Sequence, residues 1–499
     1  MSFPSLQFKG QFRGHSVGKT LLGAGKRHPR LALAAVLALA LVAAFAGPVL
    51  RHSVHAAKPI VPYPHEVAHV SFAIAGDVIP HEAVRAAAAA EGPDVQGWSA
   101  LFSDVADVFH GADFGFVNME TPVAPNHSKG SKPFMFDAPL ALPEALKANG
   151  IKIVSFANNH VMDQGWAGFA ETRDHLREIG LPFAGSGDTA AQTFQPILTE
   201  ANGIKVGWLG MTRWLNGNRN PDAADQPHVN FFPYPGEAGG APGADEPQVL
   251  AAIRTARAQC DLLVVSIHWG IEYATAPRPE DTDLAHKMLD AGASVIVGHH
   301  PHVLQPVESY RTADGRNTVI FYSLGNFLSN QSRTYVDGLM PDKEGDPRDS
   351  MIGLFSAVRQ DYGPAGMRVE LGHVGILPAW GENNRNEIAS GKTKTPIIRP
   401  VLIDREIPKL QERLDELTKL AGIDPPPPAP SAKGASSEDH GAAPAADKPT
   451  APGSLTPDQQ KDFIELTSQI KLLTDRRQQI LTRTGDEYVT EPPKLAAKP

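Results

Sequence analysis

Side chains that bind metal ions or transfer protons gather directly after short apolar runs along this sequence. The runs occupy 69–76, 114–118, 151–157, 261–267, 294–298 and 317–325. The polar residues that close or follow them are Asp77, Asn118, Glu120, Asn158, Asn159, His160, His268, His299, His300, His302 and Asn326. Carboxylate and amide oxygens, together with neutral imidazole nitrogens, suit divalent Mn, Zn, Fe or similar ions. Jointly these residues indicate a divalent-metal site, and metal-assisted phosphoester hydrolysis is the chemistry that such a set supports.

Each of these residues also has a purely structural explanation when it is taken alone. An Asp after a strand, such as Asp77, usually caps a helix or forms a turn. Asn residues such as Asn158 are favoured at positive φ, and His268 beside a Trp can be a packed core histidine. The three histidines within 299–302, in contrast, gain no packing advantage after an apolar strand. The conjunction of the clusters therefore favours a shared metal or anion site over stability alone.

The apolar runs define the elements that must position these side chains. They alternate with helical stretches such as 167–179 and 280–291, and this alternation predicts an α/β fold. Because the carboxyl ends of strands form one rim in open α/β sheets, we expect the polar clusters to converge there. Two later runs, 352–360 and 367–377, follow each other without a helix, which predicts an antiparallel pair or a second sheet.

Length, charge and cysteine content exclude several classes of function. A chain of 499 residues with 42% hydrophobic and 20% charged residues is typical of a globular protein, and its length allows two to four domains or one large domain with appendages. The formal net charge of −9, with no basic domain, argues against nucleic-acid binding. The single cysteine, Cys260, excludes an intramolecular disulfide and a thiolate metal cluster, and we expect it to be a small buried residue.

The N-terminal region predicts a membrane anchor or a secretion signal. Residues 1–30 contain six Lys or Arg and no acidic residue, and the uncharged apolar run 31–50 follows them. About 20 apolar residues span a bilayer, and the basic leader is expected to stay cytoplasmic. The length of the run favours an uncleaved single-pass anchor over a cleaved signal peptide, which would give a secreted protein. In both cases the main domain, expected at 66–400, is extracytoplasmic.

Two amphipathic helices are predicted after that domain, at 405–421 and 457–483. The Pro- and Ala-rich stretch 425–453 between them has the composition of a linker. The helices can pair across the linker or mediate self-association, or each can lie against its own domain.

In their order and content, six strings resemble the capsule-synthesis CapA family, which is related to the calcineurin-like metallophosphoesterases. They are AGDV, VNMET, FANNHVMDQG, HWGIEY, VGHHPHVLQPVE and FYSLGNFL, within about residues 67–377. The resemblance implies a four-layer fold in which two packed sheets are flanked by helices. It also implies a role in making, exporting or anchoring an extracellular polyanion such as poly-γ-glutamate, alongside other capsule-synthesis subunits.

The resemblance also implies roles for individual residues. The wider superfamily keeps its metal ligands at the positions of Asp77, Glu120, Asn159, His268, His300 and His302. His160 stands where a histidine assists the leaving group, whereas Asn118, Asn158, His299 and Asn326 are expected to support the ligands. The superfamily usually has a His two positions after its first Asp, but Ile79 stands there in this chain, and Glu120 replaces a bridging Asp.

These departures leave open a single-metal site or a non-hydrolytic, polymer-binding role. Three hypotheses for function follow. The first is a membrane-anchored, extracytoplasmic CapA-type protein that acts on a capsule polyanion through a divalent-metal site of the hydrolase type. The second is a non-enzymatic scaffold that holds a polymer or synthase subunits, and the third is a general extracytoplasmic metallophosphoesterase. Basic residues in Gly- and Pro-rich loops are candidate polyanion contacts, although ordinary solvated charges are the commoner explanation: Lys129, Lys132, Arg213, Arg219 and Arg278.

Overall fold

The computed structural model describes residues 63–130, 132–236, 243–422 and 455–492. The expected leader at 1–30, the apolar run at 31–50 and the linker at 425–453 lie outside these residues. Within the described ranges, no helix has both the length and the apolar composition that crossing a membrane requires.

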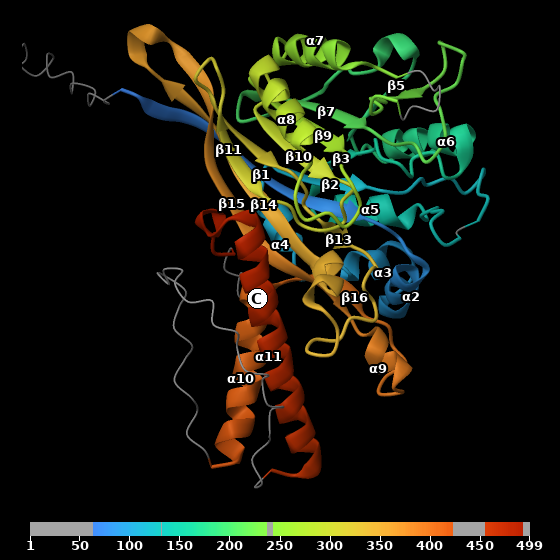
Figure 1. Cartoon of the computed structure of the whole chain (residues 1–499), viewed down its shortest axis with the longest axis vertical. Helices are drawn as coiled ribbons and strands as arrows, with labels where there is room; N and C mark the ends of the chain where they lie inside the picture. The colour runs from blue at the N-terminus through green and yellow to red at the C-terminus, as the bar shows by residue number, and fades with distance from the viewer. Residues whose placement is uncertain (1–62, 131, 237–242, 423–454, 493–499) are drawn as a thin grey trace, which may run out of the picture. The chain divides into compact units, whose positions relative to one another are not determined.

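Two mixed sheets form the framework of the described chain and confirm the α/β prediction (Figure 1). The larger sheet has the order β16-β15-β14-β1-β2-β3-β4, and β13 also pairs with β1. Its strands are β1 (His65–Val78), β2 (Phe114–Met119), β3 (Ile151–Ser155), β4 (Phe183–Ala184), β13 (Asn326–Leu328), β14 (Asp349–Asp361), β15 (Met367–Asn383) and β16 (Ile398–Leu402). Strands β1 to β4 are parallel, whereas β14 to β16 are antiparallel. The late runs at 352–360 and 367–377 are therefore an antiparallel pair within this sheet.

The smaller of the two sheets has the order β11-β12-β10-β9-β7-β6. Its strands are β6 (Ile197–Ala201), β7 (Ile204–Thr212), β9 (Leu262–His268), β10 (Val295–His299), β11 (Val307–Arg311) and β12 (Asn317–Phe321). The four central strands are parallel and the two edge strands are antiparallel. A short additional pair joins β5 (Ser186–Gly187) to β8 (His228–Val229).

Alternation of side chains along β1 builds two different cores. Phe72 and Ile74 point into the core shared by the two sheets, where Phe72 stacks on Phe355 with ring centroids 4.3 Å apart. Ala73 and Ala75 point the other way, into a core covered by helices. These helices are α2 (Glu82–Glu91), α3 (Asp94–Ala100), α4 (Ala106–Gly111), α5 (Ala141–Ala148) and α6 (Gly165–Glu178).

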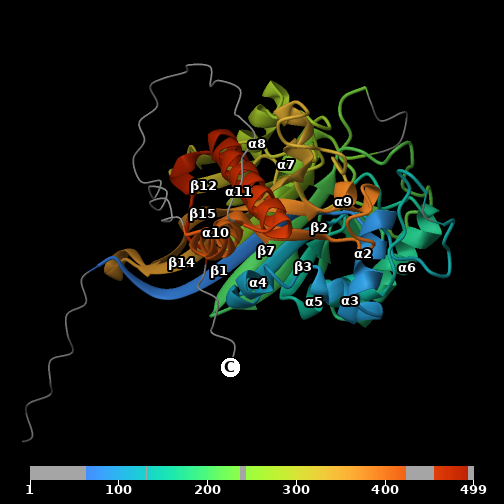
Figure 2. The same cartoon turned by 90° about the horizontal axis from the view of Figure 1, so that it is seen from below.

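A third core covers the outer face of the smaller sheet. It includes Leu263 and Val265 of β9 and the buried faces of α7 (Glu246–Arg257) and α8 (Pro279–Ala291). Figure 2 shows α7 and α8 on one side of the strands and α3, α4 and α5 on the opposite side. The layers are thus helix, sheet, sheet and helix. Cys260 is buried in this third core.

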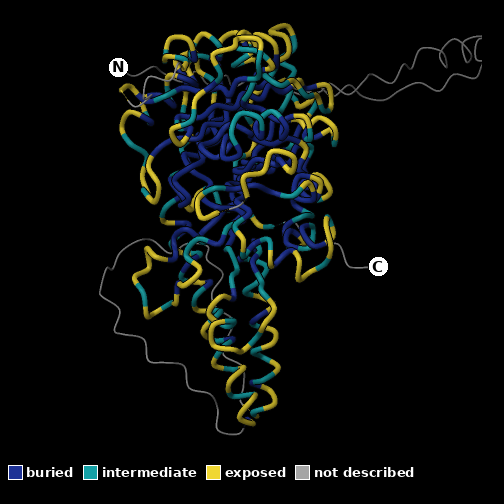
Figure 3. Tube along the Cα trace, turned by 90° about the vertical axis from the view of Figure 1, so that its right-hand side faces the viewer, coloured by how far each residue is buried: buried dark blue, intermediate teal, exposed yellow. Residues whose placement is uncertain are grey.

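Near the C-terminus, α10 (Ile403–Leu420) and α11 (Pro457–Thr484) pack against each other. The Thr456 hydroxyl accepts a hydrogen bond from Gln459 N and so caps α11. Leu410, Leu473 and Ile480 belong to the core between the sheets. Much of the remaining surface of the two helices is exposed or half-buried (Figure 3). The short helix α9 (Arg385–Ala389) precedes β16.

One predicted element boundary is wrong. The run 317–325 was expected to be one strand followed by Asn326, but β12 ends at Phe321 and Asn326 begins β13. The chain turns at Gly325, which has φ +65°, and the Gly325 carbonyl accepts a hydrogen bond from Asp77 N at 3.0 Å. A Cβ on Gly76 would lie 1.9 Å from the Gly325 carbonyl oxygen. This close approach of two backbones brings Asn326 beside Asp77.

Candidate metal centre

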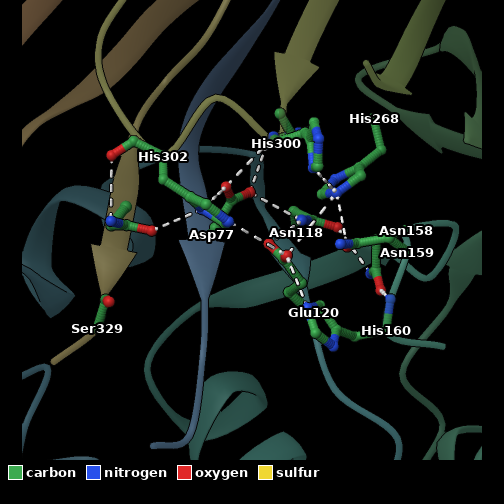
Figure 4. A network of polar contacts seen from close by, with 12 residues as sticks. Asp77, Asn118, Glu120, Asn158, Asn159, His160, His268, His300, His302 and Ser329 are labelled. Carbon is green, nitrogen blue, oxygen red and sulfur yellow. Dashed lines mark hydrogen bonds and ion pairs between the residues drawn. The ribbon is translucent and has the colours of Figure 1, made fainter. Parts of the chain in front are cut away.

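Strand register brings the polar clusters of the two sheets together. In the larger sheet Asp77 lies directly opposite both Asn118 and Asn326. In the smaller sheet His268 is paired with His299 at the ends of β9 and β10. The clusters therefore come from strand ends of both sheets rather than from the rim of one open sheet, and their side chains point toward one another (Figure 4).

Asp77 is fully buried and receives four polar contacts. Its Oδ1 accepts a hydrogen bond from Asn118 Nδ2 at 2.8 Å and lies 3.2 Å from His299 Nδ1. Its Oδ2 accepts from His300 N at 3.4 Å and lies 3.2 Å from His302 Nδ1. Burial alone would raise the pKa of Asp77, but the contacts with His299 and His302 outweigh it and hold the pKa well below its usual range. Asp77 is therefore a carboxylate inside the protein.

Glu120 is also fully buried, but its Oε1 has no hydrogen-bond partner among the described residues. Three imidazole nitrogens surround this oxygen: His268 Nε2 at 3.7 Å, His302 Nε2 at 3.7 Å and His160 Nε2 at 4.0 Å. Burial and the negative charge of Asp77 raise the pKa of Glu120 well above its usual range. A buried carboxylate oxygen without a donor calls for an explanation, and a cation held between it and the imidazoles supplies one.

Two of the buried histidines, His268 and His300, favour the neutral form. Burial, reinforced by the neighbouring His300, lowers the pKa of His268 well below its ordinary value. Burial, reinforced by His302, lowers the pKa of His300 to about 3. Neutral imidazole is the form that binds metals. His300 and His302 also adopt positive φ of 95° and 57°, a strained conformation for residues with side chains that is typical of functional sites.

The donor atoms fall into two groups that suit a cation. Asp77, Glu120 and His268 offer ligand atoms within 4.8 Å of one another, and so do Glu272, His300 and His302. His300 Nδ1 lies 3.0 Å from His268 Nε2, so the two groups adjoin. The unpartnered Glu120 Oε1 and the mixture of oxygen and neutral nitrogen donors fit one or two divalent ions.

The remaining predicted residues lie around these donors. Asn159 Oδ1 contacts His268 Nε2 at 2.9 Å. Asn158 spans its neighbours, since its Nδ2 donates to Met119 O at 2.9 Å and its Oδ1 accepts from His160 N at 3.1 Å. Asn326 Oδ1 contacts His302 Nδ1 at 3.1 Å and therefore orients that ring. All of the predicted site residues are buried in this one cluster.

Sequence reasoning missed two residues of the cluster. Asp163 Oδ2 contacts His160 Nδ1 at 2.8 Å and accepts from Phe136 N, so it fixes the imidazole. The exposed carboxylate Glu272 reaches His300 and His302. The sequence feature that could have identified Glu272 is its position in HWGIEY, four residues after His268. However, a carboxylate in an exposed loop looks like an ordinary surface charge.

Comparison with known families agrees with this geometry. The family described as "Bacterial capsule synthesis protein PGA_cap" matches residues 71–331, which include every predicted site residue. The chain belongs to the PGA_cap family. This confirms the resemblance to CapA proteins that the sequence motifs indicated.

Curated relatives of this PGA_cap protein carry related names. The capsule biosynthesis protein CapA of Bacillus anthracis is 33% identical over 242 residues, which cover 48% of this chain and 56% of that protein. The PGA biosynthesis protein CapA of Bacillus subtilis (strain 168) is also 33% identical, covering 48% and 59%. A probable polyglutamine synthesis accessory protein of Mycobacterium tuberculosis is 30% identical over 203 residues, covering 40% and 52%. The matched segment spans little more than half the length of these relatives.

Solved structures give weaker matches. The NAD nucleotidase of Haemophilus influenzae is 11% identical with a TM-score of 0.37, covering 63% of this chain and 51% of that chain. A putative 5′-nucleotidase from Staphylococcus aureus is 13% identical with a TM-score of 0.35, covering 62% and 54%. These TM-scores are too low to establish a shared fold.

Proposed function

We propose that this PGA_cap protein acts in the synthesis, export or anchoring of a capsule polyanion of the poly-γ-glutamate type, through a divalent-metal site of the hydrolase type. Family membership and the relatives' names support the polymer. The observation that carries the metal site is the fully buried Glu120, whose Oε1 lacks a hydrogen-bond donor while imidazole nitrogens of His160, His268 and His302 surround it.

The residues that would hold the metal are Asp77, Glu120, Asn159, His268, His300 and His302 (Figure 4). The exposed Glu272 extends the set toward solvent. A bound divalent ion would supply Lewis-acid polarisation of a substrate oxygen and lower the pKa of a water molecule. Asn118 and Asn326 hold Asp77 and His302 in place through their side-chain amides. Such supporting contacts keep ligands oriented before the ion arrives.

His160 is placed to move a proton. Its Nδ1 is bonded to Asp163, which fixes the ring and leaves Nε2 facing Glu120 at 4.0 Å. The Phe136 ring packs against His160 with centroids 4.6 Å apart and shields it from water. An imidazole oriented by a carboxylate can donate a proton to a departing oxygen, the role that the sequence motif implies.

We propose further that the apolar run at 31–50 anchors the chain in the cell membrane with the main domain extracytoplasmic, or directs its secretion if it is cleaved. The basic leader at 1–30 supports this orientation.

A genetic replacement tests the function. Cells that carry His300→Ala are expected to lose surface polymer, whereas cells with the exposed-histidine control His110→Ala keep it. Retention of polymer with His300→Ala and normal protein levels would refute a role for the metal site in polymer assembly. Phosphoester turnover by the purified protein, combined with unchanged polymer in a deletion strain, would instead support the general phosphoesterase.

The scaffold hypothesis needs a finer test than removal of the C-terminal helices. Deleting 405–499 would take Leu473 and Ile480 out of the core between the sheets, so loss of function would follow from misfolding alone. Substitutions on the exposed face of α11, such as Ile464→Glu, leave that core intact. Loss of polymer in this variant, with the metal-site variants still active, would favour the scaffold.

A further inference from the structure

Arg213 differs from the other candidate basic residues because it is buried without an acidic partner. Only 5% of Arg213 is exposed. By comparison, Arg219 pairs with Asp222 at 3.0 Å and Arg278 pairs with Asp281 at 2.8 Å. Lys129 and Lys132 are exposed.

The Arg213 guanidinium lies between two aromatic rings. Its central carbon is 4.0 Å from the Phe232 ring centroid and 3.8 Å from that of Tyr234. Among the described residues Nε has no hydrogen-bond partner, and Nη2 donates one long bond, to Pro233 O at 3.3 Å. The rings hold the planar group in one orientation and leave most of its donors unused. A buried cation with unused donors is costly unless an anion completes it.

Arg213 lines a cavity of about 550 Å³, a size typical of small-molecule sites. The carboxylates around this cavity already have other partners. Asp245 caps α7 by accepting from Gln248 N, Glu246 pairs with Lys287 at 2.8 Å, and Glu280 pairs with Arg278 at 3.3 Å. None of the three makes an ion pair with Arg213 in the described structure. None of these carboxylates therefore satisfies Arg213, which lines the cavity with its Nε unpartnered.

The cavity adjoins the candidate metal centre through the backbone and through one aromatic side chain. Arg213 N donates to the carbonyl of His268 at 2.9 Å. The Trp214 ring lies between Tyr234 and His300, with centroids 5.3 Å and 6.3 Å away. Trp214 therefore contacts both Tyr234, which lines the cavity, and His300 of the candidate metal centre.

We propose that Arg213 binds a carboxylate of the polymer chain in this cavity and so places the neighbouring polymer segment at the metal centre. This inference rests on the proposed function for its substrate class. The guanidinium fork matches a carboxylate in a paired geometry, and a polymer of γ-linked glutamate carries one free carboxylate on each residue. The cavity thereby selects a polycarboxylate over a neutral chain.

Binding of a synthetic γ-linked glutamate oligomer to the full-length protein tests the proposal, with a carboxamide oligomer of equal length as the uncharged ligand. Calorimetry reports binding, with tryptophan fluorescence as a second readout. The variants are Arg213→Met, Arg213→Lys and the exposed control Arg219→Met. We expect Arg213→Met to weaken binding roughly 10- to 100-fold, Arg213→Lys to weaken it less, and Arg219→Met to change it by no more than about twofold. Binding of divalent metal by Arg213→Met should equal that of the wild type.

A comparison of the two oligomers on the wild type is a second test, and it does not depend on how a variant folds. The wild type should bind the carboxamide oligomer at least about tenfold more weakly than the carboxylate oligomer. If the oligomer binds the wild type and Arg213→Met equally, the cavity assignment is overturned while the polymer function stands. If the wild type binds neither oligomer, the polymer substrate and the cavity assignment both fail. If the wild type binds inorganic phosphate but neither oligomer, and Arg213→Met loses this binding, the ligand of the cavity is a phosphate and not a carboxylate. If Arg213→Met also loses metal binding, the role of Arg213 is merely structural.

Discussion

Replacement of Arg476 by Met should destabilise the protein far more than replacement of its neighbour Arg477. Arg476 is fully buried in α11, where Nε donates to Asp349 Oδ1 and Nη2 donates to Asp346 Oδ1, both at 2.8 Å. Met keeps much of the packing but removes the nearer of two cations that compensate these buried carboxylates, and leaves only Arg483, at 3.0 Å from Asp346 and 3.8 Å from Asp349. Breaking a buried ion pair in this way costs about 3 to 5 kcal/mol of unfolding free energy. Arg477 pairs with Asp404 where both side chains are partly exposed, so Arg477→Met should cost about 1 kcal/mol or less.

The pH dependence of this loss gives a second criterion. Burial raises the pKa of Asp349 from 3.8 to about 6, although Arg476 opposes the rise. Because the folded pKa exceeds the unfolded one, this carboxyl favours the folded state most below pH 3.8, and that contribution is lost as the pH rises through about 6. Without Arg476 the folded pKa rises further, so the variant should be penalised more at about pH 8 than at about pH 5.

Urea unfolding followed by tryptophan fluorescence at both pH values measures the effect, and Arg476→Met combined with Asp349→Asn should recover part of the lost stability. The reasoning is refuted if Arg476→Met loses no more stability than Arg477→Met, or if its loss is the same at both pH values.

Three further predictions concern the supports of the site and of the fold. Asn326→Ala should weaken divalent-metal binding about 10- to 100-fold by freeing His302, as measured by calorimetry, and unchanged affinity would contradict that role. Gly76→Ala should destabilise the fold by about 3 kcal/mol or more, because its Cβ would lie 1.9 Å from the Gly325 carbonyl oxygen. Gly111→Ala, with nothing within 4 Å of its Cβ, is the matched control in the same unfolding assay. Burial would raise the pKa of Glu171, but hydrogen bonds from Asn126 and His127 lower it from 4.5 to about 2. The stabilisation that ionised Glu171 provides is therefore present above pH 4.5 and lost as the pH falls through about 2. The wild type should lose more stability than Glu171→Gln over that pH range, and equal losses would refute this role of Glu171.

Local patterns predicted the elements better than they predicted the contacts between them. The apolar runs ending at Asp77 and His268 identified strands because period and composition act over a few residues. The same logic failed at Asn326, where a turn at Gly325 and a close backbone approach to Gly76 end one strand and begin another. Nothing local in the sequence marks such a non-local contact.

Local sequence patterns also could not predict which charged residues are buried. Arg213 stands in a loop sequence resembling that of Arg219, yet the rings of Phe232 and Tyr234 bury it. Amphipathic spacing predicted helices near 405–421 and 457–483, but did not show that Arg476 would enter the interior with Asp349. Both arrangements depend on residues beyond the reach of a local pattern, since Tyr234 lies 21 positions after Arg213 and the contact between Arg476 and Asp349 spans 127.

Calorimetric titration of Mn²⁺ or Zn²⁺ into the chelator-treated full-length protein tests most directly whether Glu120 and its histidines form a metal centre. The wild type is expected to bind stoichiometrically, and Glu120→Gln to bind at least about 100-fold more weakly, because it replaces a carboxyl group that can ionise against the cation with an amide that cannot. Glu280→Gln, an exposed substitution, should bind like the wild type. No binding by the wild type, or equal binding by Glu120→Gln, would contradict the metal centre.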